Sequence, residues 1–164
     1  DTDRSRGLGD VYKRQLILML IGGSPGSTAG GLKTTTIAVV VIAVFSMAKG
    51  GDDINTFKRR IVSDVVKQSA VIILIYLFAV MLSSMIICSV EGLGMSQVLF
   101  ETASAAGTVG VSKGITNQIS VISKIILMIM MYGGRIGGLS LVLVFGQRKP
   151  EAPVKRPTEQ ILIG

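Results

Sequence analysis

The chain has 164 residues, of which 49% are hydrophobic and 16% are charged, and its mean hydropathy is +0.62. This composition is too apolar for an ordinary soluble domain and is typical of a small multi-spanning membrane protein. The absence of His and the presence of a single Cys exclude His-based triads, Cys/His zinc clusters and disulfide frameworks. The net charge of +7 comes from Lys and Arg grouped between apolar segments, a pattern that indicates membrane topology rather than nucleic-acid binding.

Residues 1–15 are polar and lack the features of a cleavable signal peptide. Their DVYKRQ ending resembles translated sequencing-adapter sequence joined to a reading frame. We therefore expect residues 1–15 to be a non-native or disordered tail, and we leave them out of the functional interpretation.

Residues 16–47 are apolar at both ends and interrupted in the middle by a run that no straight helix tolerates. This predicts a broken membrane helix. Irregular backbone at membrane depth requires protein or a water-filled cavity around it, so the break points to a pathway. We call the run the Gly-rich segment; its residues are Gly22, Gly23, Ser24, Pro25, Gly26, Ser27, Thr28, Ala29, Gly30 and Gly31.

The Gly-rich segment also has part of the spacing of a phosphate-binding P-loop, since Gly26 and Gly31 are five residues apart and Lys33 follows. That motif requires Lys directly after the second glycine, and here Leu32 intervenes. The flanking segments are apolar rather than a βαβ unit, so the nucleotide-binding alternative is rejected.

A charged connection over residues 48–67 precedes an apolar run at 68–90, which is long enough to cross a bilayer as a helix. A helix over residues 95–106 is too short to cross. A loop at 107–114 and a long apolar run at 118–146 follow. The predicted elements are therefore a membrane span, a short helix, a loop and a second membrane span, in that order. This order is typical of a re-entrant channel loop.

The loop contains Thr108, Val109, Gly110 and Val111, here called the TVGV segment. It is close to the Thr-Val-Gly core of potassium-channel filters, in which backbone carbonyls replace the hydration shell of the ion. A tight turn between two helices is the alternative. The preceding short helix favours the filter hypothesis, with potassium held at the filter backbone only.

Arg135 stands near the middle of the last apolar run, where a guanidinium is costly unless it faces water or a partner, so we expect it to face a pore. Lys33 is either a second pore charge or a side chain that reaches the cytoplasmic interface, and the sequence does not separate these. Lys124 is expected to reach the outer surface, and the Met128 to Met131 cluster to pack rather than bind metal.

Basic residues predict the orientation. The connection from Lys49 to Lys67 carries five Lys or Arg and the tail at 147–164 carries four, whereas the stretch from Glu91 to Asn117 carries only Lys113. We expect the connection and the tail to be cytoplasmic and the loop at 107–114 to open outward, in a multi-pass protein of the inner (plasma) membrane.

On these residues the chain resembles the Trk/Ktr/HKT superfamily of potassium and sodium transporters, in particular its bacterial potassium-uptake subunits. The resemblance covers residues 16–149 and is most specific at residues 21–36, which resemble the family's intramembrane loop. It implies an all-α membrane protein built from helix–pore-loop–helix repeats around one pore. Residues 16–47 would be the broken inner helix of the third repeat, and residues 68–146 the fourth repeat.

The resemblance implies channel-like potassium permeation gated by the Gly-rich segment, with Gly110 as the filter glycine and Arg135 projecting below it. It also implies a homodimer in the lipid bilayer, a cytosolic nucleotide-binding regulatory subunit, no nucleic-acid partner and no cofactor other than the transported K⁺ or Na⁺. A single filter segment cannot encircle an ion, so the chain alone is expected to be inactive. A Na⁺-coupled or Na⁺-conducting transporter and a non-transporting membrane scaffold are the alternatives; an enzyme has least support.

Overall fold

The computed structural model of the chain describes residues 2–27, 29–49, 55–56 and 59–137. Within these ranges the all-α prediction is confirmed apart from one short ribbon. The elements are α1 (Thr2–Ile21), α2 (Thr34–Ala48), β1 (Asn55–Thr56), β2 (Arg59–Arg60), α3 (Ser63–Glu91), α4 (Met95–Ala106) and α5 (Val121–Ile136). Thr28, the expected tail at 147–164 and residues 138–146 of the expected last span lie outside the described residues.

Helix α1 differs from the expectation for the N-terminal residues, because residues 2–15 are helical rather than irregular. The apolar run after Gln15 favours a helix, and a helix once nucleated extends at low cost. It ends at Ile21 because Gly22 follows with a φ of 65°, a conformation typical of a glycine that terminates a helix. Whether residues 1–15 are native to the protein stays a prediction.

The break between the first two helices is slightly longer than expected, since α1 ends at Ile21 and α2 begins only at Thr34. Lys33 is extended, with a ψ of 142°, and the N–H of Thr34 donates to the carbonyl of Gly23 at 3.1 Å. After α2, the charged connection includes the ribbon β1–β2, in which Thr56 lies opposite Arg59.

Helix α3 is the longest element, with 29 residues from Ser63 to Glu91, and is about 44 Å long at 1.5 Å per residue. It begins five residues before the predicted span, where Asp64 stabilises the first turn by lying near the positive end of the helix dipole. It ends at Gly92, which has a φ of 64° and donates its N–H to the carbonyl of Cys88.

Among the described residues, α3 is the one helix long and apolar enough to cross a membrane. Such a helix alone is weak evidence, because the core helix of a soluble protein passes the same test. In α3, however, only 22% of the most apolar stretch is buried, and large side chains such as Leu74 and Phe78 are exposed. This apolar surface requires lipid or further protein around it.

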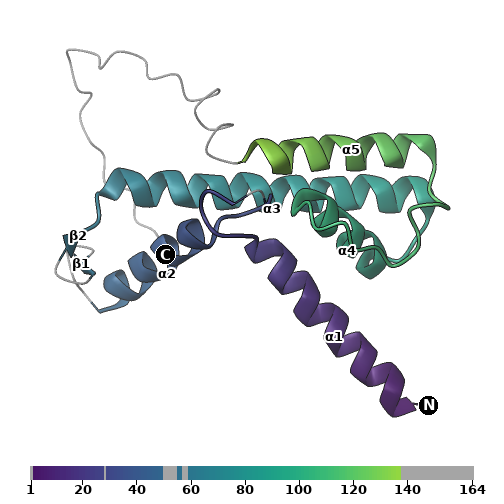
Figure 1. Cartoon of the computed structure of the whole chain (residues 1–164), viewed down its shortest axis with the longest axis horizontal. Helices are drawn as coiled ribbons and strands as arrows, with labels where there is room; N and C mark the ends of the chain where they lie inside the picture. The colour runs from purple at the N-terminus through teal and green to yellow at the C-terminus, as the bar shows by residue number, and fades with distance from the viewer. Residues whose placement is uncertain (1, 28, 50–54, 57–58, 138–164) are drawn as a thin grey trace.

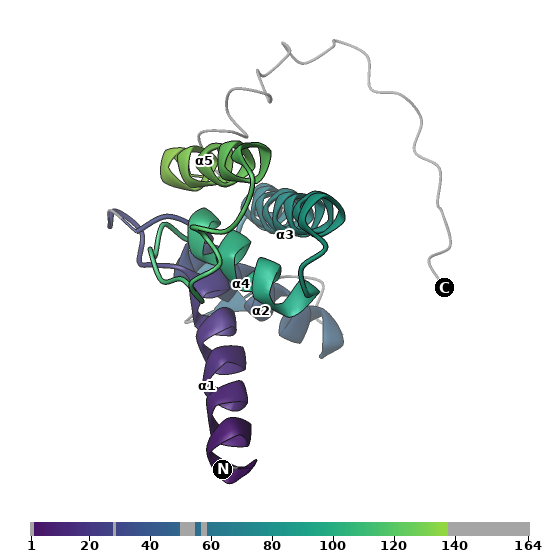
Figure 2. The ribbon, with the colours of Figure 1, turned by 90° about the vertical axis from the view of Figure 1, so that its right-hand side faces the viewer.

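Helices α3 and α5 lie side by side and antiparallel, and α4 packs against both of them (Figure 1). Figure 2 shows α3 and α5 nearly end-on, with α4 beside them and α1 projecting away from this group. The core is formed by Ile87, Val98, Ala105, Ile115, Ile119 and Leu127, which join these three helices and the loop after α4. Helix α4 is largely buried, so it holds a fixed place between α3 and α5.

Helix α5 begins three residues after the expected start at 118, because Ile115 to Gln118 form a separate turn and Ser120 caps the helix. The Oγ of Ser120 accepts a hydrogen bond from the N–H of Ser123 at 3.4 Å. Such a cap satisfies one of the free N–H groups at a helix start. The described part of α5 ends at Ile136, followed by Gly137 with a φ of 82°.

Candidate functional site

The TVGV segment begins where α4 ends. The N–H of Thr108 donates to the carbonyl of Ala105 and that of Val109 to the carbonyl of Ser104, each at 3.0 Å. The chain is therefore anchored to the last turn of α4. The negative end of the α4 dipole also lies at the start of the segment, which favours a nearby cation.

Backbone conformation in the TVGV segment is unusual at two positions. Gly110 has a φ of 80°, which glycine adopts at no steric cost. Thr108 has a φ of 53° and is the one non-glycine residue with a positive φ in the described ranges. Because a β-branched residue resists this conformation, surrounding contacts must hold Thr108 in place.

A contact between distant parts of the sequence holds Thr108. Its Oγ1 accepts a hydrogen bond from the N–H of Gly30 at 2.8 Å. A Cβ added to Gly30 would lie 2.7 Å from Thr108 Oγ1 and Cγ2 and 3.0 Å from the carbonyl oxygen of Gly134. The Gly-rich segment is thus packed tightly between the TVGV segment and α5, an approach that only glycine permits.

The Gly-rich segment has two different halves. Residues 24–27 and Ala29 are exposed, whereas Gly30 and Gly31 are buried, as is Leu32 directly after the segment. The ammonium of Lys33 turns back and donates to the carbonyls of Ala29 at 2.5 Å and Ser27 at 3.3 Å. This contact of Lys33 with the Gly-rich segment was not among the two roles considered from the sequence, and its exposure to a pore stays a prediction.

Arg135 lies in the last turn of α5 and shares an open hollow with residues of the TVGV segment. The hollow has a volume of about 430 Å³ and is lined by Ser104, Thr108, Gly110, Met131, Tyr132 and Arg135. Within the described ranges Arg135 has no ion-pair or hydrogen-bond partner. Its side chain is therefore not fixed by a partner at the hollow.

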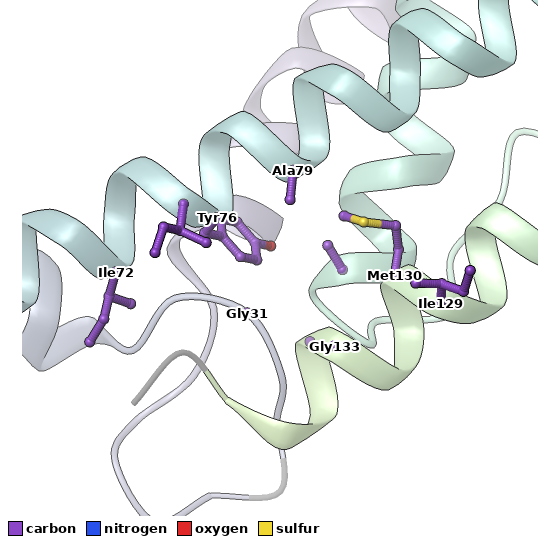
Figure 3. Close-up of a pocket in the computed structure, with 10 residues that line it drawn as sticks. Gly31, Ile72, Tyr76, Ala79, Ile129, Met130 and Gly133 are labelled. Carbon is purple, nitrogen blue, oxygen red and sulfur yellow. The ribbon is translucent and has the colours of Figure 1, made fainter. Parts of the chain in front are cut away.

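Behind the Gly-rich segment is a second, apolar cavity of about 210 Å³ (Figure 3). It lies between α3 and α5, and Gly31, Tyr76, Met130 and Gly133 are among the residues that line it. The buried hydroxyl of Tyr76 has no hydrogen-bond partner among the described residues. A void beside the buried half of the Gly-rich segment leaves room for that half to move.

A buried carboxylate near the TVGV segment was missed from the sequence. Glu101, on α4, is 7% exposed and accepts hydrogen bonds from Ser112, Lys113 and Thr116. The sequence contained a signal for this site, because Glu101 is the one charged residue in the short segment 95–106. A charged residue needs hydrogen-bond partners when it is buried. Which residues supply them depends on the path of the loop.

No group of three or more His, Cys, Asp or Glu side chains suited to a metal ion occurs in the part of the chain that the structure describes. The residues around the hollow include no carboxylate, and the atoms that line it are mainly apolar.

Comparison with known proteins gives one family and several relatives. The TrkH family profile, described as a cation transport protein, matches residues 14–155. Ktr system potassium uptake protein D of Bacillus subtilis is 37% identical, with 90% of this chain and 33% of the relative covered. Potassium/sodium uptake protein NtpJ of Enterococcus hirae is 35% identical, with 91% of this chain and 34% of the relative covered. Ktr system potassium uptake protein B of Bacillus subtilis is 32% identical, with 91% of this chain and 33% of the relative covered.

The chain spans about a third of the length of these curated relatives. Both the Gly-rich segment and the TVGV segment lie inside the matched residues, as do Glu101 and Arg135. All three relatives are named for uptake of ions and none for an enzymatic reaction.

Proposed function

The chain belongs to the TrkH family of cation transport proteins, and from this we propose that it is part of the pore-forming subunit of a bacterial potassium-uptake system. The names of its relatives support the cation, since two are potassium uptake proteins and one is a potassium/sodium uptake protein. Because the chain spans about a third of these relatives, we propose that transport belongs to a longer protein and that this chain is inactive alone.

We propose that residues 68–146 form one helix–pore-loop–helix repeat and that residues 16–47 form the broken inner helix of the repeat before it. The packing of α4 between α3 and α5 supports the first assignment, because a short buried helix followed by an extended loop suits a re-entrant segment. The interruption between α1 and α2 supports the second.

The TVGV segment is, in this proposal, one quarter of a selectivity filter. The observation that carries it is the hollow shared by Thr108, Gly110 and Arg135. It brings residues of the filter-like segment, the end of a short helix and Arg135 to one space, although the sequence separates Thr108 from Arg135 by 27 residues. In a ring of four such segments, the hollow would face the ion path.

The Gly-rich segment is, in the same proposal, the gate. Its backbone N–H at Gly30 already contacts Thr108, so a movement of the segment alters the TVGV segment directly. The exposed half at 24–27 and the apolar cavity beside Gly31 supply the freedom to move. A flexible break in a permeation path can occlude it or withdraw.

We propose a membrane orientation with the loop after α4 outside and the basic connection before α3 inside, as the distribution of Lys and Arg favours. We also propose a homodimer with a cytosolic nucleotide-binding regulatory subunit. Two relatives are named as members of a Ktr system, which supports the presence of further subunits.

Replacement of Gly110 by Ser in the complete transporter tests the filter assignment. A Cβ at Gly110 would meet no atom within 4 Å, so the substitution strains the backbone without a clash. A left-handed conformation costs an L-residue about 1–2 kcal/mol, so we expect the ratio of K⁺ to Na⁺ uptake to fall roughly tenfold. The ratio is measured with both ions in the same cells.

Gly92→Ser is the matched control, because Gly92 also has a positive φ and open space around it but ends α3, away from the TVGV segment. We expect this variant to keep the wild-type ratio. An unchanged ratio in Gly110→Ser would remove the filter assignment.

A sodium-conducting or sodium-coupled transporter is the second candidate, and the potassium/sodium uptake protein among the relatives favours it. Uptake assays separate the two. Potassium uptake that requires Na⁺ supports coupling, whereas potassium uptake that is independent of Na⁺ supports channel-like permeation.

A further inference from the structure

Glu101 is a buried carboxylate that points to the loop rather than to a basic side chain. Its Oε1 accepts from the Ser112 hydroxyl at 2.5 Å and from the N–H of Lys113 at 2.8 Å. Its Oε2 accepts from the Thr116 hydroxyl at 3.1 Å. All three donors lie within five residues of the end of the TVGV segment.

No cation compensates this carboxylate within the described ranges. The ammonium of Lys113 lies instead over the ring of Phe100, at 4.9 Å from its centroid. A buried carboxylate is costly unless donors satisfy it, and hydrogen bonds to a charged group are the strong ones. The loop residues that follow Val111 are therefore held by Glu101 itself.

Helix α4 consequently holds the TVGV segment at both ends. At the near end, the N–H groups of Thr108 and Val109 bind the carbonyls of the last turn of α4. At the far end, Ser112 and Lys113 bind Glu101, one turn earlier on the same helix. Gly110 and Val111 lie between the two attachments.

We propose that Glu101 is a positioning residue that sets the ion selectivity of the TVGV segment by holding its outer end. The inference rests on the proposed filter function. Discrimination between K⁺ and the smaller Na⁺ requires that the carbonyls cannot close around the smaller ion. A segment fixed at both ends resists that closure, whereas one fixed only at Thr108 and Val109 does not.

Replacement of Glu101 by Ala and by Gln in the complete transporter tests this role, with the ratio of K⁺ to Na⁺ uptake as the readout. The ratio is independent of how much protein reaches the membrane. For Glu101→Ala we expect K⁺ uptake to persist and the ratio to fall roughly tenfold, because charge-assisted hydrogen bonds are lost. For Glu101→Gln, which keeps the size and one carbonyl acceptor, we expect a smaller fall.

Removal of the hydroxyl groups that donate to Glu101 should also lower the ratio of K⁺ to Na⁺ uptake. We expect Ser112→Ala combined with Thr116→Val to lower the ratio as Glu101→Gln does. Thr102→Val is the matched control, since it removes a buried hydrogen bond of the same helix, to Ser84 at 2.6 Å, on the side away from the loop. We expect it to leave the ratio unchanged.

If the Glu101→Ala protein is not inserted into the membrane, the uptake ratio of Glu101→Gln tests the role of Glu101 instead. An unchanged ratio in Glu101→Gln and in the double variant, alongside a reduced ratio in Gly110→Ser, overturns the role of Glu101 alone. An unchanged ratio in all of these variants overturns the filter assignment as well. A reduced ratio in Thr102→Val would assign the effect to general destabilisation of α4.

Discussion

Arg135 lines, with Thr108 and Gly110, the hollow that we propose to face the ion path, and it has no ionic partner within the described ranges. A positive charge beside a cation path raises the free energy of a passing ion. In an environment that is partly aqueous the effect is moderate, since solvent and salt screen it. A single substitution at Arg135 should therefore change the rate of transport.

We expect Arg135→Gln to increase the maximal rate of K⁺ uptake by about fivefold, which corresponds to removal of a barrier on the order of 1 kcal/mol. Uptake is measured as a function of external K⁺ in cells that lack other potassium transporters. The increase should shrink at high ionic strength.

Lys124→Gln is the matched control for Arg135→Gln. It removes a charge of the same sign from the same helix, but from the first turn of α5 rather than the last. We expect no change in the maximal rate. A reduced rate in Arg135→Gln at normal membrane abundance would contradict the barrier and indicate that the guanidinium supports the fold.

At the scale of elements, the Gly-rich segment between α1 and α2 is joined to the loop after α4 by the hydrogen bond from Gly30 to Thr108. The ammonium of Lys33 donates hydrogen bonds to the carbonyls of Ser27 and Ala29 in the exposed part of the segment. The buried part borders the apolar cavity. The segment thus has one defined position, which we propose to be the closed one, and adjacent space. These are the physical requirements of a two-state element.

We expect Gly30→Ala to displace the Gly-rich segment from Thr108, because the added methyl group would lie 2.7 Å from two atoms of that side chain. Loss of the hydrogen bond costs the closed position about 1 kcal/mol, which increases the open population and the K⁺ uptake rate by up to about fivefold. The measurement is the initial rate of uptake per transporter in the membrane.

Gly26→Ala controls for a change within the Gly-rich segment, because a Cβ there meets no atom within 4 Å. It strains the backbone at a φ of 80° but leaves the contact with Thr108 intact. We expect a smaller effect on the rate. Loss of uptake in Gly30→Ala at normal abundance would mean that the segment supports the pathway rather than closes it.

The whole molecule has an uneven distribution of charge along an apolar chain. Outside residues 1–15, which carry four Lys or Arg, basic residues concentrate between α2 and α3 and in the tail at 147–164, and the stretch from Glu91 to Asn117 carries only Lys113. The exposed apolar surface of α3 requires lipid or neighbouring repeats around it. Together these features predict which ends of α3 and α5 face the cytoplasm.

Cysteine labelling tests this orientation in the complete transporter, after its native cysteines, Cys88 among them, have been replaced by Ser. In that background we expect a membrane-impermeant thiol reagent applied to intact cells to label Asn117→Cys and not Lys49→Cys. Both positions are exposed. After permeabilisation both should be labelled, and the reverse pattern in intact cells would invert the proposed topology.

Much of the architecture was accessible from local sequence. The break after Ile21 was predicted from its glycines and Pro25, and α4 occupies the residues expected for the short helix at 95–106. The family resemblance, carried mainly by residues 21–36, is confirmed by the match over residues 14–155. The structure differs from the sequence-based expectation at the ends of elements. Residues 2–15 are helical, and α5 starts at Val121, where Ser120 provides the cap.

The sequence by itself determined the class of the molecule and the order of its elements, because apolar length, glycine positions and caps act over a few residues. Only the tertiary structure decided which distant atoms meet. Gly30 and Thr108 are 78 residues apart, and Glu101 finds its donors up to 15 residues ahead. Such pairs depend on how α3, α4 and α5 pack, and a side chain's partner across a fold is not encoded in its neighbours.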